Sequence, residues 1–199
     1  METKQIKIEV ADPTPLGLFG LALVTLVASS QKLGITDGFS LVLPWAILLG
    51  GFAQFIASIF DFKHNNLFGA TAFAAYGLFW MGMGMSWLIR MGCFGEALAA
   101  SADIRQMGFV FTGYFIFTVV LVISTIKMSK AMFFLMSLIA VLFFGLALDA
   151  FGCGHIWHLL AACSELAISL LAFYVLASKY LNSFFGREIL CAGKPFCSK

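Results

Sequence analysis

The feature that most restricts the fold of this chain is a series of six long apolar runs, each long enough to cross a lipid bilayer. A helix needs about 20 apolar residues to span the hydrocarbon core. In order, the runs occupy residues 13–30, 39–60, 66–89, 107–126, 131–148 and 156–177. They are apolar on every face and lack an alternation with period two, which argues against a soluble domain and against a β-barrel. We therefore predict an all-α membrane protein with six transmembrane helices.

The composition supports this prediction and leaves no room for a second domain. Hydrophobic residues make up 61% of the chain and charged residues 11%, whereas soluble domains have about 25% charged residues. We divide the chain into a cytoplasmic N-terminal segment (1–12), a six-helix transmembrane domain (13–180) and a cytoplasmic tail (181–199). The first segment mixes acidic and basic residues, so it lacks the basic-then-apolar order of a secretory signal.

The distribution of basic residues predicts the orientation. With six spans, both termini lie on one side, which holds nine lysine and arginine residues against three on the other side. Because basic loops favour the cytoplasm, we predict that both termini are cytoplasmic. The longest connection lies around residues 92–106, between the third and fourth runs.

Several classes of function are excluded or left open by the motifs. The sequence contains no HExxH, GxSxG or GxxxxGK[ST] motif and no cysteine–histidine spacing typical of a metal site, so we predict no enzyme, no metal and no cofactor. A net charge of +2 does not indicate nucleic acid as a partner. Cys93 and Cys153 both fall on the side away from the termini, and the sequence leaves open whether they form a disulfide.

Polar side chains inside the runs are the candidates for contact with a solute. Gln54, Thr71 and Tyr76 either join helices by hydrogen bonds or line a solute path, and the sequence leaves both open. Glu165 is the acid nearest the middle of a run, where a carboxyl group must face the bundle interior or stay protonated. It is a candidate for proton coupling, or it is satisfied by nearby serines or by a neighbouring subunit.

The start of the first run combines proline with glycine. Pro13 and Pro15 are expected to disturb regular hydrogen bonding there, and Gly17 and Gly20 leave backbone groups accessible. Distorted helix starts in transporters contact anions, which the positive end of the helix dipole favours. We therefore expect a small carboxylate to meet the backbone in this region.

Four motifs occur in the order and spacing of a known family. They read DPTPLGL at 12–18, GGFAQ at 50–54, NNLFGATAFAAYGLFW at 65–80 and FGR at 185–187. They resemble motifs of the acetate uptake transporter family, also called the succinate–acetate permeases: NPAPLGL, GG-x-AQ, N-x-FG-x-TAF-x-x-YG-x-FW and FGR. The resemblance covers nearly the whole chain.

The resemblance implies a six-helix protomer with a pore through each subunit, assembled as a homo-hexamer in the lipid bilayer of the cell (inner) membrane. It implies transport of acetate, succinate or other short carboxylates, often with protons. Carried over by position, the apolar constriction consists of Leu21, Tyr76 and Leu138. The family usually has phenylalanine where Leu21 stands, which implies a wider constriction here.

The first motif implies further contacts and also departs from the family. It adds Pro15, Leu16 and Gly17 to the residues expected to bind the substrate. Asp12 replaces the family's asparagine and would either cap the first helix or repel an anion. At the position of Glu165 the family tends to have a small or apolar residue.

A small carboxylate needs hydrogen-bond donors and a dry neck more than it needs fixed charge. We expect the donors to be the backbone of Gly17 and Gly20 and the side chains of Gln54, Thr71 and Tyr76. No lysine or arginine is expected inside a span, where it would hold an anion too tightly for release. The main hypothesis is thus an acetate channel or proton-coupled symporter. The alternatives are a channel for a small neutral solute, such as urea or ammonia, and a membrane organiser without transport activity.

Overall fold

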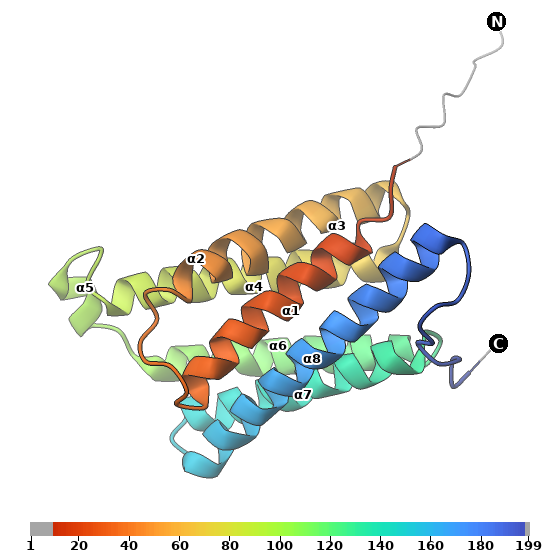
Figure 1. Ribbon diagram of the computed structural model, residues 1–199. Helices are drawn as coiled ribbons and strands as arrows, with labels where there is room; N and C mark the ends of the chain where they lie inside the picture. Colours follow the sequence, from red (N-terminus) through yellow and green to blue (C-terminus); the bar gives the residue numbers. More distant parts are fainter. Residues whose placement is uncertain (1–9, 198–199) are drawn as a thin grey trace, which may run out of the picture.

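The computed structural model describes residues 10–197, and within them six helices are long and apolar enough to cross a membrane. This confirms the predicted all-α, six-span architecture (Figure 1). In chain order the elements are α1 (Thr14–Lys32), α2 (Leu43–Trp45), η1 (Ala46–Ala53), α3 (Gln54–Lys63), α4 (Leu67–Arg90), α5 (Glu96–Ala100), α6 (Ile104–Thr125), α7 (Lys130–Ala150) and α8 (His155–Phe185). Together α2, η1 and α3 form the second span, Leu43–Lys63.

Short polar residues set the starts of several spans. The Asn66 side chain accepts a hydrogen bond from the backbone of Gly69 at the start of α4, and Ser129 does the same for Met132 at the start of α7. Both satisfy backbone N–H groups that have no partner within the helix. At the other end of the chain, Gly186 stops α8 with a left-handed conformation (φ 63°), which glycine adopts without strain.

The second span is not a uniform α-helix. Its middle part, η1, is a π-helix of eight residues that contains Gly50 and Gly51. Segments of this kind widen the helix and often occur at functional sites. Here η1 is followed at once by Gln54, whose Nε2 donates to the carbonyl oxygen of Gly50 at 2.9 Å. The sequence did not reveal this distortion.

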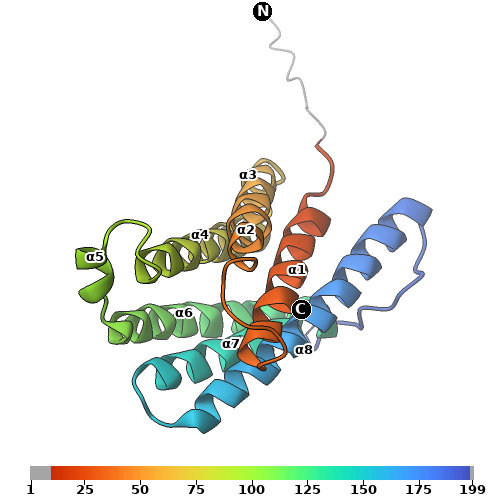
Figure 2. The same ribbon diagram turned by 60° about the vertical axis from the view of Figure 1, so that its left-hand side comes forward.

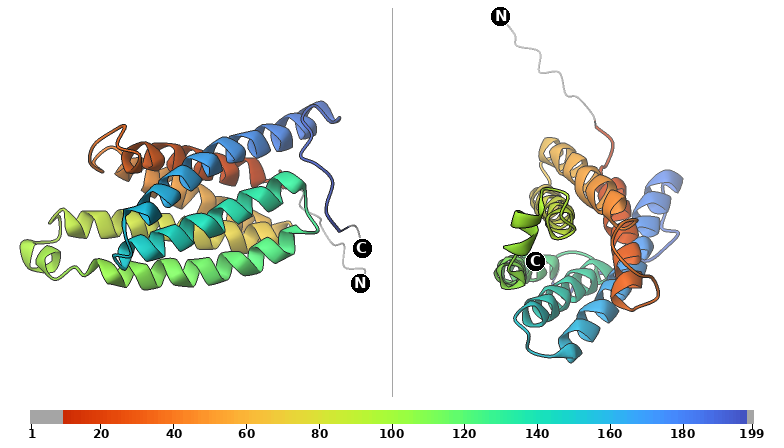
Figure 3. Two further views of the ribbon diagram at one scale, coloured as in Figure 1. Left: turned by 90° about the horizontal axis from the view of Figure 1, so that it is seen from below. Right: turned by 90° about the vertical axis from the view of Figure 1, so that its left-hand side faces the viewer.

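The six spans surround a common axis, as the end-on view in Figure 3 shows. Around that axis α4 packs on the second span, the second span on α1, α1 on α8, α8 on α7 and α7 on α6. The backbones of α4 and α6 approach each other least closely, and side chains close that seam. The Tyr114 hydroxyl donates to the carbonyl oxygen of Ala75 at 2.9 Å, and the rings of Tyr114 and Phe79 lie 4.9 Å apart.

The loops fall at the two ends of the bundle. The start of α1, the end of α8 and the α6–α7 turn share one end, called here the termini end (Figure 1). The short helix α5 lies beyond the spans at the opposite end, between α4 and α6 (Figure 2). It occupies the predicted longest connection. Which end of the bundle faces the cytoplasm stays a prediction. The division of the chain at residues 12 and 180 also stays a prediction, since residues 1–9 lie outside the described part and α8 continues past residue 180.

The structure describes both the cysteines that the sequence left open and the course of the tail. Cys93 and Cys153 are both exposed and free, so no disulfide joins them. The tail folds back onto the termini end. There the Asn182 side chain accepts from the backbone of Leu190, and the backbone of Phe196 donates to Ile126 in the α6–α7 turn.

Close backbone packing against η1 requires glycine at position 20. A Cβ atom placed there would overlap the carbonyl oxygen of Leu49. We expect Gly20→Ala to destabilise the fold by about 1–3 kcal/mol through overpacking, and thermal unfolding in detergent measures the change. Gly113→Ala is the matched control, because a Cβ there meets nothing within 4 Å. Equal midpoints for the two variants would contradict this account of the α1–η1 contact.

Candidate functional site

A cavity of about 70 Å³ lies inside the bundle toward the termini end. One water needs roughly 15 Å³ by this kind of measure, so the cavity has room for a molecule of a few heavy atoms. Its wall is mostly apolar, and its polar members are Thr14, Gln54, Asn66, Tyr76 and Lys179. The apolar members are Leu18, Leu21, Phe68, Gly69, Ala72, Phe73, Met128, Met132, Leu135, Met136 and Ile139. We call this space the inner cavity.

A second, smaller cavity of about 20 Å³ adjoins it on the bundle axis. Three residues line both spaces: Leu21 of α1, Tyr76 of α4 and Ile139 of α7. We call these three side chains the neck. Apart from the neck, the second cavity is lined by Thr25, Phe79, Trp80, Leu142, Phe143 and Ile168. We call the two cavities and the neck together the passage, and its lining is mostly apolar.

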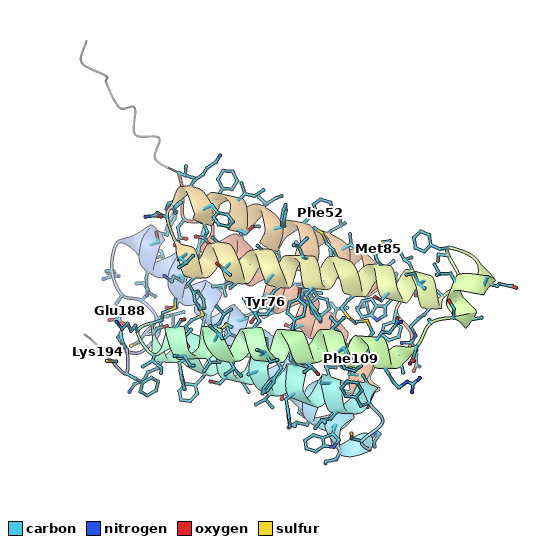
Figure 4. All side chains as sticks on the ribbon, turned by 180° about the vertical axis from the view of Figure 1, so that it is seen from behind. Phe52, Tyr76, Met85, Phe109, Glu188 and Lys194 are labelled. Carbon is cyan, nitrogen blue, oxygen red and sulfur yellow. The ribbon has the colours of Figure 1, made fainter. Side chains whose placement is uncertain are left out.

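Tyr76 is held firmly at the neck. Figure 4 places it in the middle of the bundle, whereas Phe52, Met85 and Phe109 lie on its outer surface. The Tyr76 hydroxyl lies 2.9 Å from Thr118 Oγ1 on α6. Its ring packs against Phe117 and Phe143, at centroid distances of 5.9 and 6.1 Å. These contacts fix both the ring and the direction of its hydroxyl group.

The second span contributes two buried oxygen atoms without hydrogen-bond partners. Among residues 10–197, Gln54 Oε1 and Asp61 Oδ2 are the buried side-chain polar atoms of this kind. Gln54 is completely buried and lines the inner cavity. The other oxygen of Asp61, Oδ1, accepts a hydrogen bond from Asn66 Nδ2, and Asp61 also packs against Gly69. Asn66 and Gly69 both line the inner cavity. Sequence analysis missed Asp61, because it closes the second run and resembles an ordinary helix end.

The structure brings together two of the three residues of the expected constriction. Leu21 and Tyr76 meet at the neck, but Leu138 is only half-buried and lines neither cavity. Its neighbour Ile139 takes the third place, because one residue turns a helix by about 100°. Gln54 also lies where a solute could reach it.

The other predicted contacts do not come together at the passage. Leu16 is exposed, Pro15 and Thr71 are half-buried, and none of them lines either cavity. Gly17 packs against the Phe73 ring. The expected distortion at the start of α1 is absent, since the backbone N–H groups of Leu16 and Gly17 both donate to the carbonyl oxygen of Pro13. These groups are therefore not free to bind an anion.

Glu165 has a partner that the sequence did not suggest. Its Oε2 lies 2.8 Å from Lys32 Nζ at the end of α1, and the two side chains are 2% and 16% exposed. The expectation that the spans hold no lysine is thus corrected, because α1 extends to Lys32. His158 lies beside the pair and contacts the Lys32 carbonyl oxygen at 3.1 Å. Neither member of the ion pair lines the inner or the second cavity.

The inner cavity adjoins a wide depression at the termini end. This depression, of about 600 Å³, shares Met128, Met132 and Lys179 with the cavity. Its rim includes Lys127 and, from the folded-back tail, Gly193. The two lysine side chains, the Asp12 carboxylate and several polar side chains thus line the approach to a mostly apolar passage.

The chain is similar to known proteins in both sequence and structure. The model of the GPR1/FUN34/yaaH family matches residues 2–188. The chain is 30% identical over 188 residues to the succinate-acetate/proton symporter SatP of Escherichia coli K12, covering 94% of this chain and 97% of SatP. A solved structure of the bacterial acetate channel SatP superimposes with a TM-score of 0.85 at 27% identity, covering 92% of this chain and 98% of that one. Ammonia transport outward protein 2 of Saccharomyces cerevisiae is 34% identical over 145 residues, 71% of this chain and 51% of its own length.

Proposed function

The chain belongs to the GPR1/FUN34/yaaH family of acetate uptake transporters, a family of multi-pass membrane transporters and not of enzymes, and from this premise we propose that it carries acetate and related short carboxylates through the neck. The observation that supports the proposal best is that Leu21, Tyr76 and Ile139 line two cavities at once. A narrow apolar neck between two spaces suits a solute of a few heavy atoms that binds weakly enough to leave.

We further propose that the protein works as a homo-hexamer in the cell (inner) membrane, with both termini cytoplasmic. The family resemblance and the excess of basic residues on the side of the termini support this. Large apolar side chains such as Phe52 and Phe109 are exposed on the outer surface of the protomer, where lipid or neighbouring subunits can cover them.

A channel for a small neutral solute is the second candidate. The two cavities lack a charged side chain apart from Lys179 at the mouth, and such a lining also suits ammonia or urea. Similarity to a yeast protein described as an ammonia transporter supports this candidate.

Uptake by reconstituted protein tests the proposal. Purified protein in lipid vesicles should take up labelled acetate faster than empty vesicles, and unlabelled succinate, formate and propionate should compete to different degrees. Protein-dependent flux of ammonia or urea, with none of acetate, would support the second candidate instead. Vesicles in which the protein moves none of these solutes would contradict both.

A further inference from the structure

The hydroxyl hydrogens of the residues that line the neck and the second cavity are already committed to other partners, and from this we infer that the passage takes the undissociated carboxylic acid rather than the carboxylate anion. This inference rests on the proposed function and adds the protonation state of the substrate. It also reverses the expectation that Gln54 and Tyr76 serve the solute chiefly as hydrogen-bond donors.

The Tyr76 hydroxyl offers the neck an acceptor. Thr118 Oγ1 lies 2.6 Å from the carbonyl oxygen of Tyr114, to which it donates its single hydrogen. The same Oγ1 lies 2.9 Å from the Tyr76 hydroxyl. Since Thr118 has no second hydrogen to give, Tyr76 must be the donor in that contact. What remains of the Tyr76 hydroxyl for a solute is therefore a lone pair.

Thr25 presents the second cavity with the same chemistry. Its hydroxyl donates to the carbonyl oxygen of Leu21 in its own helix at 2.8 Å. It is buried and lines the second cavity next to the neck. A threonine hydroxyl has one hydrogen, so the Thr25 hydroxyl has no hydrogen left to donate to a solute.

Gln54 adds an acceptor on the other side of the neck. One hydrogen of its Nε2 goes to Gly50, while its Oε1 has no partner at all although the side chain is completely buried. A buried acceptor without a partner is costly, so a solute that brings a hydrogen gains here. The second amide hydrogen can meet the carbonyl oxygen of the same solute, which makes Gln54 complementary to a carboxylic acid group.

A carboxylate ion has no hydrogen for any of these three oxygen atoms. It would face lone pairs along the passage and would lose its water in an apolar surrounding, which costs an ion far more than a neutral group. The undissociated acid supplies one O–H donor, and its methyl group fits the apolar wall. The donors that suit an anion lie at the mouth, where Lys179 and Asn66 line the inner cavity.

The proton then needs no titrating side chain in the passage. The acid takes its proton from water on one side, crosses as a neutral molecule, and releases the proton into water on the other side. This explains coupling between acid and proton without Glu165, which lies in its ion pair outside both cavities. Transport by this route moves no net charge.

Vesicles with an imposed membrane potential provide the main test. Acetate uptake by empty vesicles is subtracted, pH is varied at constant total acetate, and a potassium gradient with valinomycin sets the potential. We expect protein-dependent uptake to fall about tenfold per pH unit once most of the acid is dissociated, in proportion to the undissociated fraction. We also expect it to acidify the lumen and to be unaffected by the potential. Protein-dependent uptake that follows the membrane potential and the anion concentration would overturn the inference and leave the proposed function intact. A lack of protein-dependent uptake at every pH would refute the proposed function itself.

Competition by molecules of nearly equal size tests the same point without changing pH. Acetamide and acetone have as many heavy atoms as acetic acid, but only acetamide carries N–H donors. We expect acetamide to inhibit acetate uptake and acetone to have no effect at equal concentration. Equal inhibition by both would show that the acceptors do not select the solute and would overturn the inference.

A threonine pair provides the matched variants. Thr25→Val removes an acceptor from the second cavity at nearly constant shape, and we expect protein-dependent uptake at acid pH to fall about two- to tenfold, as for the loss of one hydrogen bond. Thr112 donates to its own helix in the same way but lines neither cavity, so Thr112→Val should match the unaltered protein. A Thr25→Val variant that transports normally would contradict the role given to its oxygen.

Discussion

Replacing Lys32 with methionine lowers the stability of the folded protein by about 3 kcal/mol, because it leaves the buried Glu165 carboxylate without its partner. The two groups form a 2.8 Å ion pair that is largely shielded from solvent. Removing one member of such a pair costs more than the pair contributes, since nothing compensates the charge that remains. In a chain of 199 residues, this loss corresponds to a fall of about 6–12 °C in Tm, which thermal unfolding in detergent can resolve.

A double variant and a surface pair serve as controls. Lys32→Met combined with Glu165→Leu removes both charges, and we expect it to regain most of the lost stability. Arg105→Ala breaks the exposed pair with Asp103, whose side chains are 71% and 39% exposed, and should hardly change Tm. If Lys32→Met alone unfolds at the temperature of the unaltered protein, the pair does not stabilise the α1–α8 contact. An unchanged pH profile of acetate uptake in Glu165→Gln would leave Glu165 with a structural role only.

Replacing Ile139 with tryptophan abolishes acetate uptake, because the neck has no room for a larger side chain. Ile139 is 3% exposed and lines both the inner cavity and the 20 Å³ space beyond the neck. An indole at this position would fill the gap between Leu21 and Tyr76. Uptake of labelled acetate by reconstituted vesicles should then equal that of empty vesicles.

The adjacent residue offers a close control for this variant. Leu138 lies on the same helix, is half-buried and lines neither cavity. Leu138→Trp should therefore keep most of the uptake, while both variants add the same bulk to α7. A reversed result, with Leu138→Trp blocked and Ile139→Trp active, would restore the constriction predicted from the sequence and move the passage to the other face of α7.

The fold could be predicted from the sequence because lipid imposes one simple rule. Each span must be apolar over about 20 residues, so the six runs and their order were visible without a structure. Most predicted ends differ from the helices by a few residues, as at α6, which begins at Ile104 rather than near Met107, but α8 ends at Phe185, eight residues beyond the predicted end at 177. Polar residues tolerated in the first and last turns of a span make these limits hard to read.

The candidate site was predicted less completely, and the misses have physical reasons. Tyr76 and Gln54 could be singled out from the sequence because a large polar group in an apolar run needs a partner, and both line the inner cavity. Leu138 was carried over by position from the family resemblance, whereas its neighbour Ile139 lies at the neck. The Lys32–Glu165 pair joins residues 133 positions apart, and no local pattern indicates such a contact. Which acceptor receives the hydroxyl hydrogen of Tyr76 or Thr118 depends on neighbouring groups that only the fold brings together.

The π-helical turn of the second span has a consequence for sequence change in this protein. Eight residues in wide turns, Ala46–Ala53, act as a register offset between the two halves of the span. A π-helix takes up more residues per turn than an α-helix, so deleting one residue from this stretch would let ordinary α-helical winding resume without turning the second half of the span far from its present direction. Gln54 would then keep its place near the bundle axis. A one-residue gap here would therefore disturb the passage less than the same gap in a regular α-helix, where it rotates everything beyond it by about 100°.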